Sequence, residues 1–266
     1  MPENGLCATT GPTALAATRN RAAVMAELRR LMPRIGEQRK PLPFGLGTID
    51  SHLPDGGLAC GALHEIVPAA EGCVAAAFGF IAAILARVAS PLLFVMPAYG
   101  LRPYRPHGRL HGHGLNALGL DPARLILVET AHRKETLWAM EEAVRSVAPA
   151  AVAGVIDTLD LKLSQRLHLA ATDAGLPVFL LRPAPTLELS AAATRWRIGT
   201  AQAARDRFGL VTQPRWHLQL ERCRNGRPGE WVVEYDHVAH RFSLAAALAD
   251  FSRARGAGET SIRQAS

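Results

Sequence analysis

Residues 65–78 read EIVPAAEGCVAAAF, a stretch in which a short apolar segment runs through a turn into a long apolar one. The segment 62–67 is typical of a buried strand, and the run 73–88 has the length and composition of a helix that is apolar nearly all round. A strand that leads through a tight turn into a buried helix begins a βαβ unit. The stretch therefore predicts an α/β fold, and the residues of its turn decide what the turn can bind.

The sequence after this stretch continues to alternate between strand and helix patterns. Four further strands are predicted, at 91–97, 125–130, 151–157 and 177–183. Helices are predicted between them, near 114–119 and at 134–147 and 163–175. Such alternation specifies a mostly parallel sheet with right-handed crossovers and helices on both faces.

The last third of the chain has a different character. Residues 184–214 are rich in Ala and Arg with weak patterning, so we expect a flexible segment or loop there. Residues 216–244 alternate like two strands joined by the turn NGRPG at 225–229. The sequence thus predicts a C-terminal β-hairpin after the parallel strands.

The 266 residues suit one α/β core with extensions at both ends. We predict an N-terminal amphipathic helix (13–32) and linker in 1–41, a core in 42–250 and a disordered tail in 251–266. No membrane span or secretory signal is expected, which favours the cytoplasm. The four cysteines show no CxxC spacing and are expected to be free thiols.

Residues 45–66, GLGTIDSHLPDGGLACGALHEI, resemble the segment that leads into the core of RecA-type ATPases. The strand AVAGVIDT at 151–158 resembles the Walker B strand of that core. Within this superfamily the chain resembles the ImuA family, through the same leading segment, the VIDT and FLLRP strands and the late stretch WHLQLERCRNGRPGEW. The resemblance covers about 42–245 and implies a RecA-like P-loop-type core.

The resemblance to ImuA also implies a role and partners. It implies a protein of a DNA-damage-induced mutagenesis cassette, active in error-prone translesion synthesis. The implied partners are ImuB, an error-prone C-family DNA polymerase and RecA itself. RecA packs its N-terminal helix on a neighbouring subunit, so the helix at 13–32 could serve self-association or partner binding, or simply cover its own core.

The turn of the opening stretch lacks the chemistry of a phosphate loop. In the frame G-x-x-x-x-G-K-[ST], Pro68 and Cys73 take the glycine positions, Val74 the lysine and Ala75 the hydroxyl. A slip of one residue places Gly72 at the second glycine but leaves Cys73 and Val74 in the last two positions. The small side chains suggest a turn that is packed shut. We therefore expect no nucleotide cofactor.

The other parts of an ATPase site are also incomplete. The strand at 91–97 continues into Ala98 and Tyr99 with no glutamate before Glu129, whereas RecA-type ATPases carry a catalytic glutamate just after this strand. Asp157 matches the Walker B aspartate, which serves Mg²⁺ held by a phosphate loop. Without that loop Asp157 is expected to order the residues after its strand. We therefore predict a protein that is not an enzyme.

Two further groups of residues suggest chemistry and have simpler explanations. Histidines 64, 107, 111 and 113 could form a metal site, but the Gly, Pro and Arg around them favour an exposed loop. Ser164 and His168 lie four apart on a predicted helix. No strained turn presents Ser164 as a nucleophile, so surface polar residues are the better reading.

The positive charge of the chain is concentrated in arginine. The net charge is +7, lysine occurs only at 40, 134 and 162, and such a bias suits phosphate or carboxylate partners or a high-GC genome. The clustered arginines are Arg195, Arg197, Arg205, Arg207, Arg215, Arg222, Arg224 and Arg227.

Trp196, Phe208 and Trp216 lie among these arginines, a combination that could hold single-stranded DNA. The alternatives are a solvated basic face and a surface for an acidic protein. We expect changes of Arg222, Arg224 and Arg227 to Ala to weaken binding without lowering thermal stability.

Two other functions stay open at this point. The chain could be a nucleotide-dependent, RecA-like DNA-binding ATPase with a cryptic site, although it has no phosphate-loop lysine. It could also inhibit cell division by binding the division GTPase.

Overall fold

The computed structural model describes residues 40–98, 110–182, 189–205 and 207–245. The predicted N-terminal helix and C-terminal tail lie outside these residues, as does His107. The proposed boundaries of the three regions therefore stay predictions. In the described part, no helix is long and apolar enough to cross a membrane.

Nine strands form one sheet in the order β3-β2-β4-β5-β1-β6-β7-β8-β9. Six of them, from β3 to β6, are parallel: β1 (Leu63–Pro68), β2 (Leu92–Pro97), β3 (Leu125–Thr130), β4 (Ala151–Val155), β5 (Val178–Leu181) and β6 (Thr194–Arg205). The remaining three continue the sheet antiparallel to their neighbours: β7 (Val211–Cys223), β8 (Gly229–Asp236) and β9 (Arg241–Leu244).

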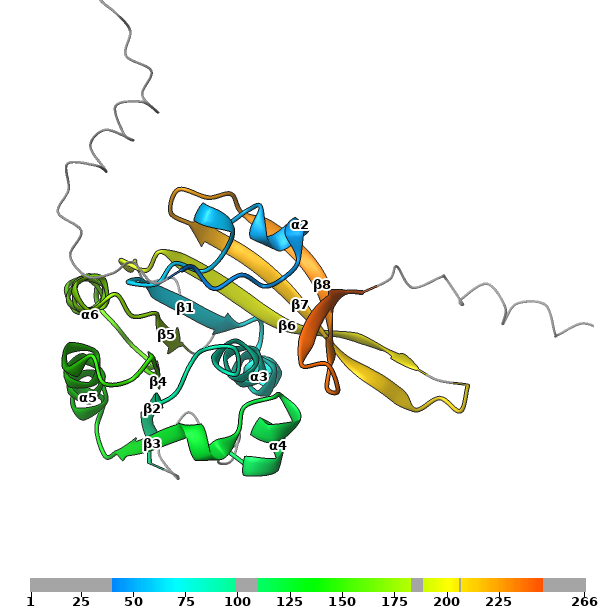
Figure 1. Ribbon diagram of the computed structural model, residues 1–266, viewed down its shortest axis with the longest axis horizontal. Coiled ribbons are helices and arrows are strands. Elements are labelled where there is room, and N and C mark those ends of the chain that lie inside the picture. Colours follow the sequence, from blue (N-terminus) through cyan, green and yellow to red (C-terminus); the bar gives the residue numbers. More distant parts are fainter. Residues whose placement is uncertain (1–39, 99–109, 183–188, 206, 246–266) are drawn as a thin grey trace, which may run out of the picture. The chain divides into compact units, whose positions relative to one another are not determined.

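Helices cover both faces of the parallel strands (Figure 1). Helix α3 (Val74–Leu85) lies on one face, and α5 (Arg133–Ser146) and α6 (Leu161–Ala174) lie on the other. Two shorter helices, α2 (Gly47–Asp50) and α4 (Gly112–Ala117), lie near β8 and α3 respectively. Short 3-10 turns occupy Pro54–Gly56, Glu71–Cys73 and Pro122–Arg124. The mostly parallel α/β architecture predicted from the sequence is confirmed.

The two faces of the sheet bury separate hydrophobic cores. The larger core joins α3 to the inner face of the antiparallel strands, where Phe80, Trp196 and Phe242 meet. The smaller core lies under α5 and α6 and contains Met140 and Leu167. Nearly all of α3 is buried, as its apolar composition predicts, because α3 lies between the sheet and the aromatic cluster.

The expectation of a loop over 184–214 is wrong. Strand β6 begins at Thr194 and β7 at Val211, so most of this stretch is regular structure. Its alternation is real but weak in composition, since buried Trp196 and Ile198 alternate with the partly buried Arg195 and Arg197 on the opposite face. The predicted hairpin exists as β7–β8, and it belongs to a four-stranded antiparallel unit that also contains β6 and β9.

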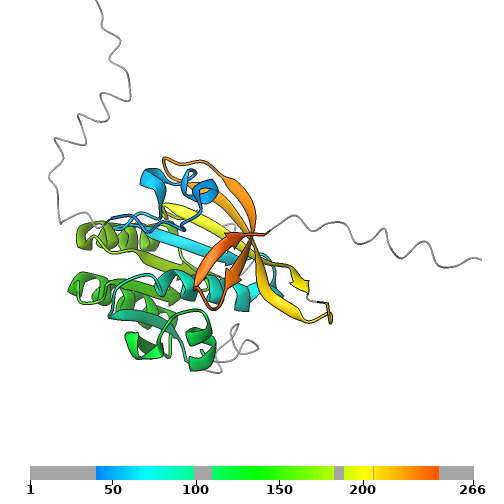
Figure 2. The ribbon, with the colours of Figure 1, turned by 45° about the vertical axis from the view of Figure 1, so that its right-hand side comes forward.

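The connected ends of β6 and β7 extend beyond the other strands (Figures 1 and 2). The antiparallel pairing of these strands has register shifts after Ala201, where the ribbon leaves the body of the sheet. Phe208 and Leu210 at its tip are 72% and 65% exposed. The tip therefore presents apolar side chains to solvent.

Candidate functional site

The turn between β1 and α3 uses its backbone amides inside the protein. The N–H of Ala69 donates to the carbonyl of Ile198 (2.8 Å), and the N–H of Cys73 donates to the carbonyl of Ala70 (2.9 Å). The N–H of Val74 donates to the carbonyl of Glu71. A phosphate loop needs such amides to point at the ligand. Three of the amides at this turn are therefore committed elsewhere.

The side chains of the turn are not packed shut, which corrects that expectation. Pro68 ends β1 in a buried position and Val74 begins α3 in another, whereas residues 69–72 and Ala75 are exposed. A Cβ on Gly72 would meet nothing within 4 Å. The turn is thus a short solvent-exposed connection, held by hydrogen bonds within itself and by one to β6.

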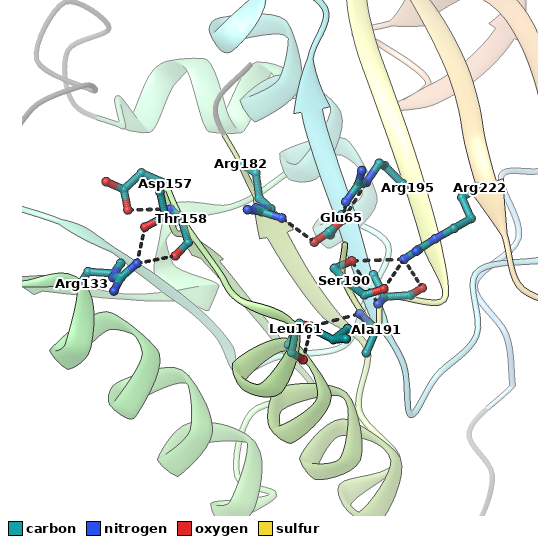
Figure 3. A network of polar contacts seen from close by, with 12 residues as sticks. Glu65, Arg133, Asp157, Thr158, Leu161, Arg182, Ser190, Ala191, Arg195 and Arg222 are labelled. Atoms are coloured by element: carbon teal, nitrogen blue, oxygen red, sulfur yellow. Dashed lines mark hydrogen bonds and ion pairs between the residues drawn. The ribbon is translucent and has the colours of Figure 1, made fainter. Parts of the chain in front are cut away.

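Asp157 contacts the chain directly after β4. Its Oδ1 accepts from the N–H of Thr158 (2.8 Å), and Arg133 at the start of α5 donates to the carbonyl (3.1 Å) and hydroxyl of Thr158. Figure 3 shows this group at the end of its strand. Strand β5 separates β4 from β1, so Asp157 and the β1–α3 turn belong to strands that are not neighbours.

A buried ion-pair network is centred on Glu65 of β1 (Figure 3). Glu65 is fully buried on the face of β1 that also carries Leu63 of the smaller core. Its Oε1 accepts from Nη1 of Arg182 (3.2 Å), which is also fully buried, and its Oε2 accepts from Nε of Arg195 on β6 (2.8 Å). One carboxylate therefore joins two guanidinium groups at the boundary of the parallel and antiparallel strands.

Arg222 extends this network toward the segment before β6. Its Nη2 donates to the carbonyl and hydroxyl of Ser190 (2.9 and 3.1 Å) and to the carbonyl of Ala192 (2.8 Å). Burial lowers the pKa of Arg222, and the charge of Arg195 lowers it further. Arg222 therefore anchors the chain segment that enters β6.

Ser164 and His168 are not surface polar residues, which corrects that expectation. Ser164 is fully buried; its hydroxyl donates to the carbonyl of Leu161 (2.8 Å) and accepts from the N–H of Ala191 (3.0 Å). His168 is half-buried, and its Nδ1 accepts from the N–H of Leu63 (3.3 Å). Burial lowers the pKa of His168, with a smaller contribution from Arg224. Both side chains tie α6 to the sheet.

Comparison with known proteins identifies the family. The chain is 34% identical over 236 residues to Protein ImuA of Caulobacter vibrioides, in strain NA1000 / CB15N and equally in strain ATCC 19089 / CIP 103742 / CB 15. The alignment covers 80% of this chain and 93% of each relative. The chain belongs to the ImuA family. No protein-family model matches the chain.

In this ImuA-family chain, the clustered arginines fall into distinct structural groups. Three of them pair with acids: Arg195 with Glu65, Arg197 with Glu221, and Arg215 with Glu234. Three others donate to backbone carbonyls: Arg222 as above, Arg224 to Ala191 and Arg227 to Ser51. The last two lie at the β6–β7 tip, where Arg205 donates to the carbonyl of Gly209 and Arg207 lies over the Phe208 ring at 4.7 Å.

These placements change the expected effect of arginine substitutions. Arg222 makes three hydrogen bonds to the segment before β6, so its removal is expected to lower stability. The expectation that Arg222, Arg224 and Arg227 can be changed without loss of stability therefore conflicts with their contacts. Two of the three aromatic residues also have core roles, since Trp196 and Trp216 are 1% and 5% exposed. Among these three, Phe208 is the exposed one.

The histidines do not gather around β1. His64 is fully buried, where its Nδ1 lies 2.8 Å from the hydroxyl of Thr194 and its Nε2 lies 2.9 Å from the carbonyl of Ala59. Burial lowers the pKa of His64 to about 4. The rings of His111 and His113 lie 5.3 Å apart near α4. Across the described ranges, no three His, Cys, Asp or Glu side chains are grouped so as to hold a metal.

Sequence reasoning missed the network around Glu65. In the sequence, Glu65 belongs to the leading segment at 45–66 and Arg182 belongs to the FLLRP strand. One signal was available: a glutamate inside a strand expected to be buried requires a cationic partner. The sequence does not show which of its thirty lysines and arginines pair with Glu65, because the two partners, Arg182 and Arg195, lie 117 and 130 residues away from it. Only the fold brings them together.

Proposed function

We propose that this chain is a non-catalytic, RecA-like adaptor in DNA-damage-induced, error-prone translesion synthesis. Membership of the ImuA family supports this role, since the family resemblance implies a place in the mutagenesis cassette. The implied partners are ImuB, an error-prone C-family DNA polymerase and RecA. The leading segment at 45–66 and the parallel sheet support a RecA-like core.

The β1–α3 turn carries the proposal that the core has no ATPase chemistry. Val74 and Ala75 replace the lysine and hydroxyl, and the amides of Ala69, Cys73 and Val74 donate to carbonyl groups of the protein. Triphosphate binding would require both a cation for the β and γ phosphates and outward amides. Asp157 is engaged with Thr158 and, in this proposal, serves only the local structure.

Nucleotide binding tests this part of the proposal. A fluorescent ATP analogue with Mg²⁺ is titrated into the full chain, with RecA as the positive control. We expect no saturable binding in the micromolar range. Micromolar affinity that depends on Mg²⁺ would support the alternative of an ATPase with a cryptic site and overturn the adaptor proposal.

Co-purification tests the biological role. The tagged chain is isolated from cells with damaged DNA, and the bound proteins are compared with those from undamaged cells. We expect ImuB or RecA in the damaged sample. Recovery of the division GTPase in place of both would favour a cell-division inhibitor.

Contact with single-stranded DNA is proposed for the β6–β7 tip. Arg205, Arg207 and exposed Phe208 lie together there, and arginine with an aromatic ring is the combination that holds single strands. A double change of Arg205 and Arg207 to Ala should weaken binding of a labelled single strand severalfold at low salt. The control is Arg145→Ala on α5, which removes one exposed arginine elsewhere. Equal binding by both variants would remove the tip from the proposal.

A further inference from the structure

The parallel helices α5 and α6 leave a groove between their outer faces. Two hollows line it, of about 300 Å³ toward the N-terminal ends of the helices and about 350 Å³ toward their C-terminal ends. Arg166 borders both hollows, and its ion pair with Glu141 joins α6 to α5 where the two hollows meet this side chain. Each helix has 14 residues, which corresponds to a groove of about 20 Å, or four helical turns.

The groove exposes large apolar side chains that the core does not use. Trp138 on α5 is 64% exposed, and Leu169 on α6 is 60% exposed. Val147, at the C-terminal end of α5, is 49% exposed in a left-handed backbone conformation that usually favours glycine. Trp138 borders the N-terminal hollow, and Val147 and Leu169 border the C-terminal one. Large apolar side chains that are exposed beside hollows are a feature of docking surfaces.

The charge of the groove differs along its length. Three cations and one carboxylate line the N-terminal hollow: Arg133, Lys134, Arg166 and Glu141. The carboxylate is already paired, since Glu141 accepts from Nη2 of Arg166 at 2.7 Å. This end of the groove is therefore complementary to carboxylates.

We propose that the α5–α6 groove binds an amphipathic, acidic helical segment of a partner protein. The apolar stripe of such a helix would cover Trp138 and Leu169, and its carboxylates would lie over Arg133 and Lys134. Helix binding in a groove uses apolar anchors at i, i+3, i+4 and i+7, which span about 10 Å and fit within the length of α5 and α6. The inference builds on the adaptor role, and it names the chemistry of one partner contact.

The chain's own terminal segments are less suited to the groove. Residues 1–39 contain six arginines and three glutamates, a net charge of +3. Residues 246–266 contain three arginines and two acids, a net charge of +1. Both segments would bring positive charge to the basic end. Charge complementarity therefore favours a separate, acidic partner over either segment.

A designed peptide provides the test with the full chain. The probe is a helical peptide of about five turns with leucine at the anchor positions and glutamate elsewhere. Its twin has lysine in place of every glutamate. We expect the acidic peptide to saturate and to change the emission of Trp138, because Trp138 is the most exposed of the four tryptophans. Equal binding of the lysine peptide would overturn the proposal.

Substitutions locate the binding site. Trp138→Ala and Leu169→Asp should each weaken binding of a dye-labelled acidic peptide about tenfold or more, because both remove a central anchor. Lys134→Glu should weaken it severalfold, and added salt should reduce that difference. Arg166 is left intact because it neutralises buried Glu141. Val238→Asp, at a position 92% exposed in the β8–β9 turn, is the matched control and should bind like the unchanged chain.

The remaining outcomes also decide the question. Unfolding midpoints of the variants should stay close to that of the unchanged chain, since the altered side chains are exposed; if Trp138→Ala fails to fold, Leu169→Asp and Lys134→Glu carry the test. Peptide binding that appears only after removal of 1–39 would make that segment the occupant and overturn the proposal. A Trp138-dependent dimer in sedimentation would do the same in favour of a second copy. If the groove variants bind the peptide normally while ImuB still co-purifies, the groove inference fails and the adaptor role stands.

Discussion

The parallel and antiparallel halves of the sheet differ in where they carry charged side chains. Strands β4 and β5 of the parallel half are entirely buried and contain no charged residue. In the antiparallel half, one face joins the aromatic core and the other carries ion pairs across strands, such as Arg197–Glu221 and Arg215–Glu234. The two halves differ because helices cover both faces of β4 and β5, whereas the antiparallel strands keep one face open.

The boundary between the two halves combines both conditions. β1 is buried on both faces, yet its neighbour β6 belongs to the charged unit, so Glu65 and Arg195 meet in a buried setting. Charge on the open face costs little, but charge at this boundary must be paired. The comparison thus predicts that substitutions matter most at the boundary, less inside the parallel half and least on the open face.

Glu65→Gln should have the largest effect. It removes the carboxylate charge between Arg182 and Arg195, and breaking a buried ion pair typically costs about 3–5 kcal/mol. Urea denaturation measures the loss. Glu142→Gln, which affects an exposed pair with Arg145, is the control and should cost about 1 kcal/mol or less. Equal losses in the two variants would contradict a special role for the boundary.

Acid should lower the stability of the folded protein through His64, which lies at the same boundary and contacts Thr194 of β6. The unfolded chain protonates this histidine near pH 6.5, whereas burial lowers its pKa to about 4 in the folded state. Stability from neutral His64 is therefore present in full above pH 6.5 and is lost as the pH falls toward 4, by about 3 kcal/mol in total.

His64→Gln isolates this contribution. The variant cannot titrate, so the stability of the unchanged chain should fall more steeply between pH 6.5 and 4 than that of the variant. Urea denaturation at several pH values measures both slopes. If stability falls equally steeply with pH in both proteins, the pKa of His64 is the same in the folded and the unfolded chain.

Gly154→Ala tests close packing inside the parallel half. A Cβ at this position of β4 would lie 2.3 Å from Sδ of buried Met140 on α5, so the helix or its methionine must move. Overpacking of this kind costs about 1–3 kcal/mol. Gly72→Ala in the β1–α3 turn is the matched control, because nothing lies within 4 Å of its Cβ. Thermal unfolding should separate the two variants, and a similar midpoint for both would argue against tight α5–β4 packing.

The smallest effect is expected for the open face. A double-mutant cycle on Arg197 and Glu221, each about a quarter exposed, should give a coupling energy of about 0.2–1 kcal/mol that decreases with salt. Denaturant unfolding of the four proteins measures it. A coupling as large as the loss in Glu65→Gln would erase the distinction between the open face and the boundary.

Much of the parallel half could be predicted, because its signals are local. The strand at 125–130 was placed at its observed bounds, and the other strands and helices were placed within a few residues. The stretch 184–214 could not, since arginines and alanines have low strand preference and their alternation gains meaning only against a neighbouring strand. The exposure of the β1–α3 turn could not be predicted either, since its small side chains suggested a closed turn, and its lack of phosphate-loop chemistry stays a prediction.

The sequence by itself determined the α/β class, the order of elements and the absence of phosphate-loop residues between β1 and α3. These follow from periodicity and residue type, which act over short distances along the chain. Only the tertiary structure decided that Glu65 joins Arg182 and Arg195, that most clustered arginines already have partners, and that Trp138 and Leu169 are exposed on two helices that pack together. These relations depend on strand order and helix placement, because the residues that meet are far apart in sequence and come together only when the sheet forms.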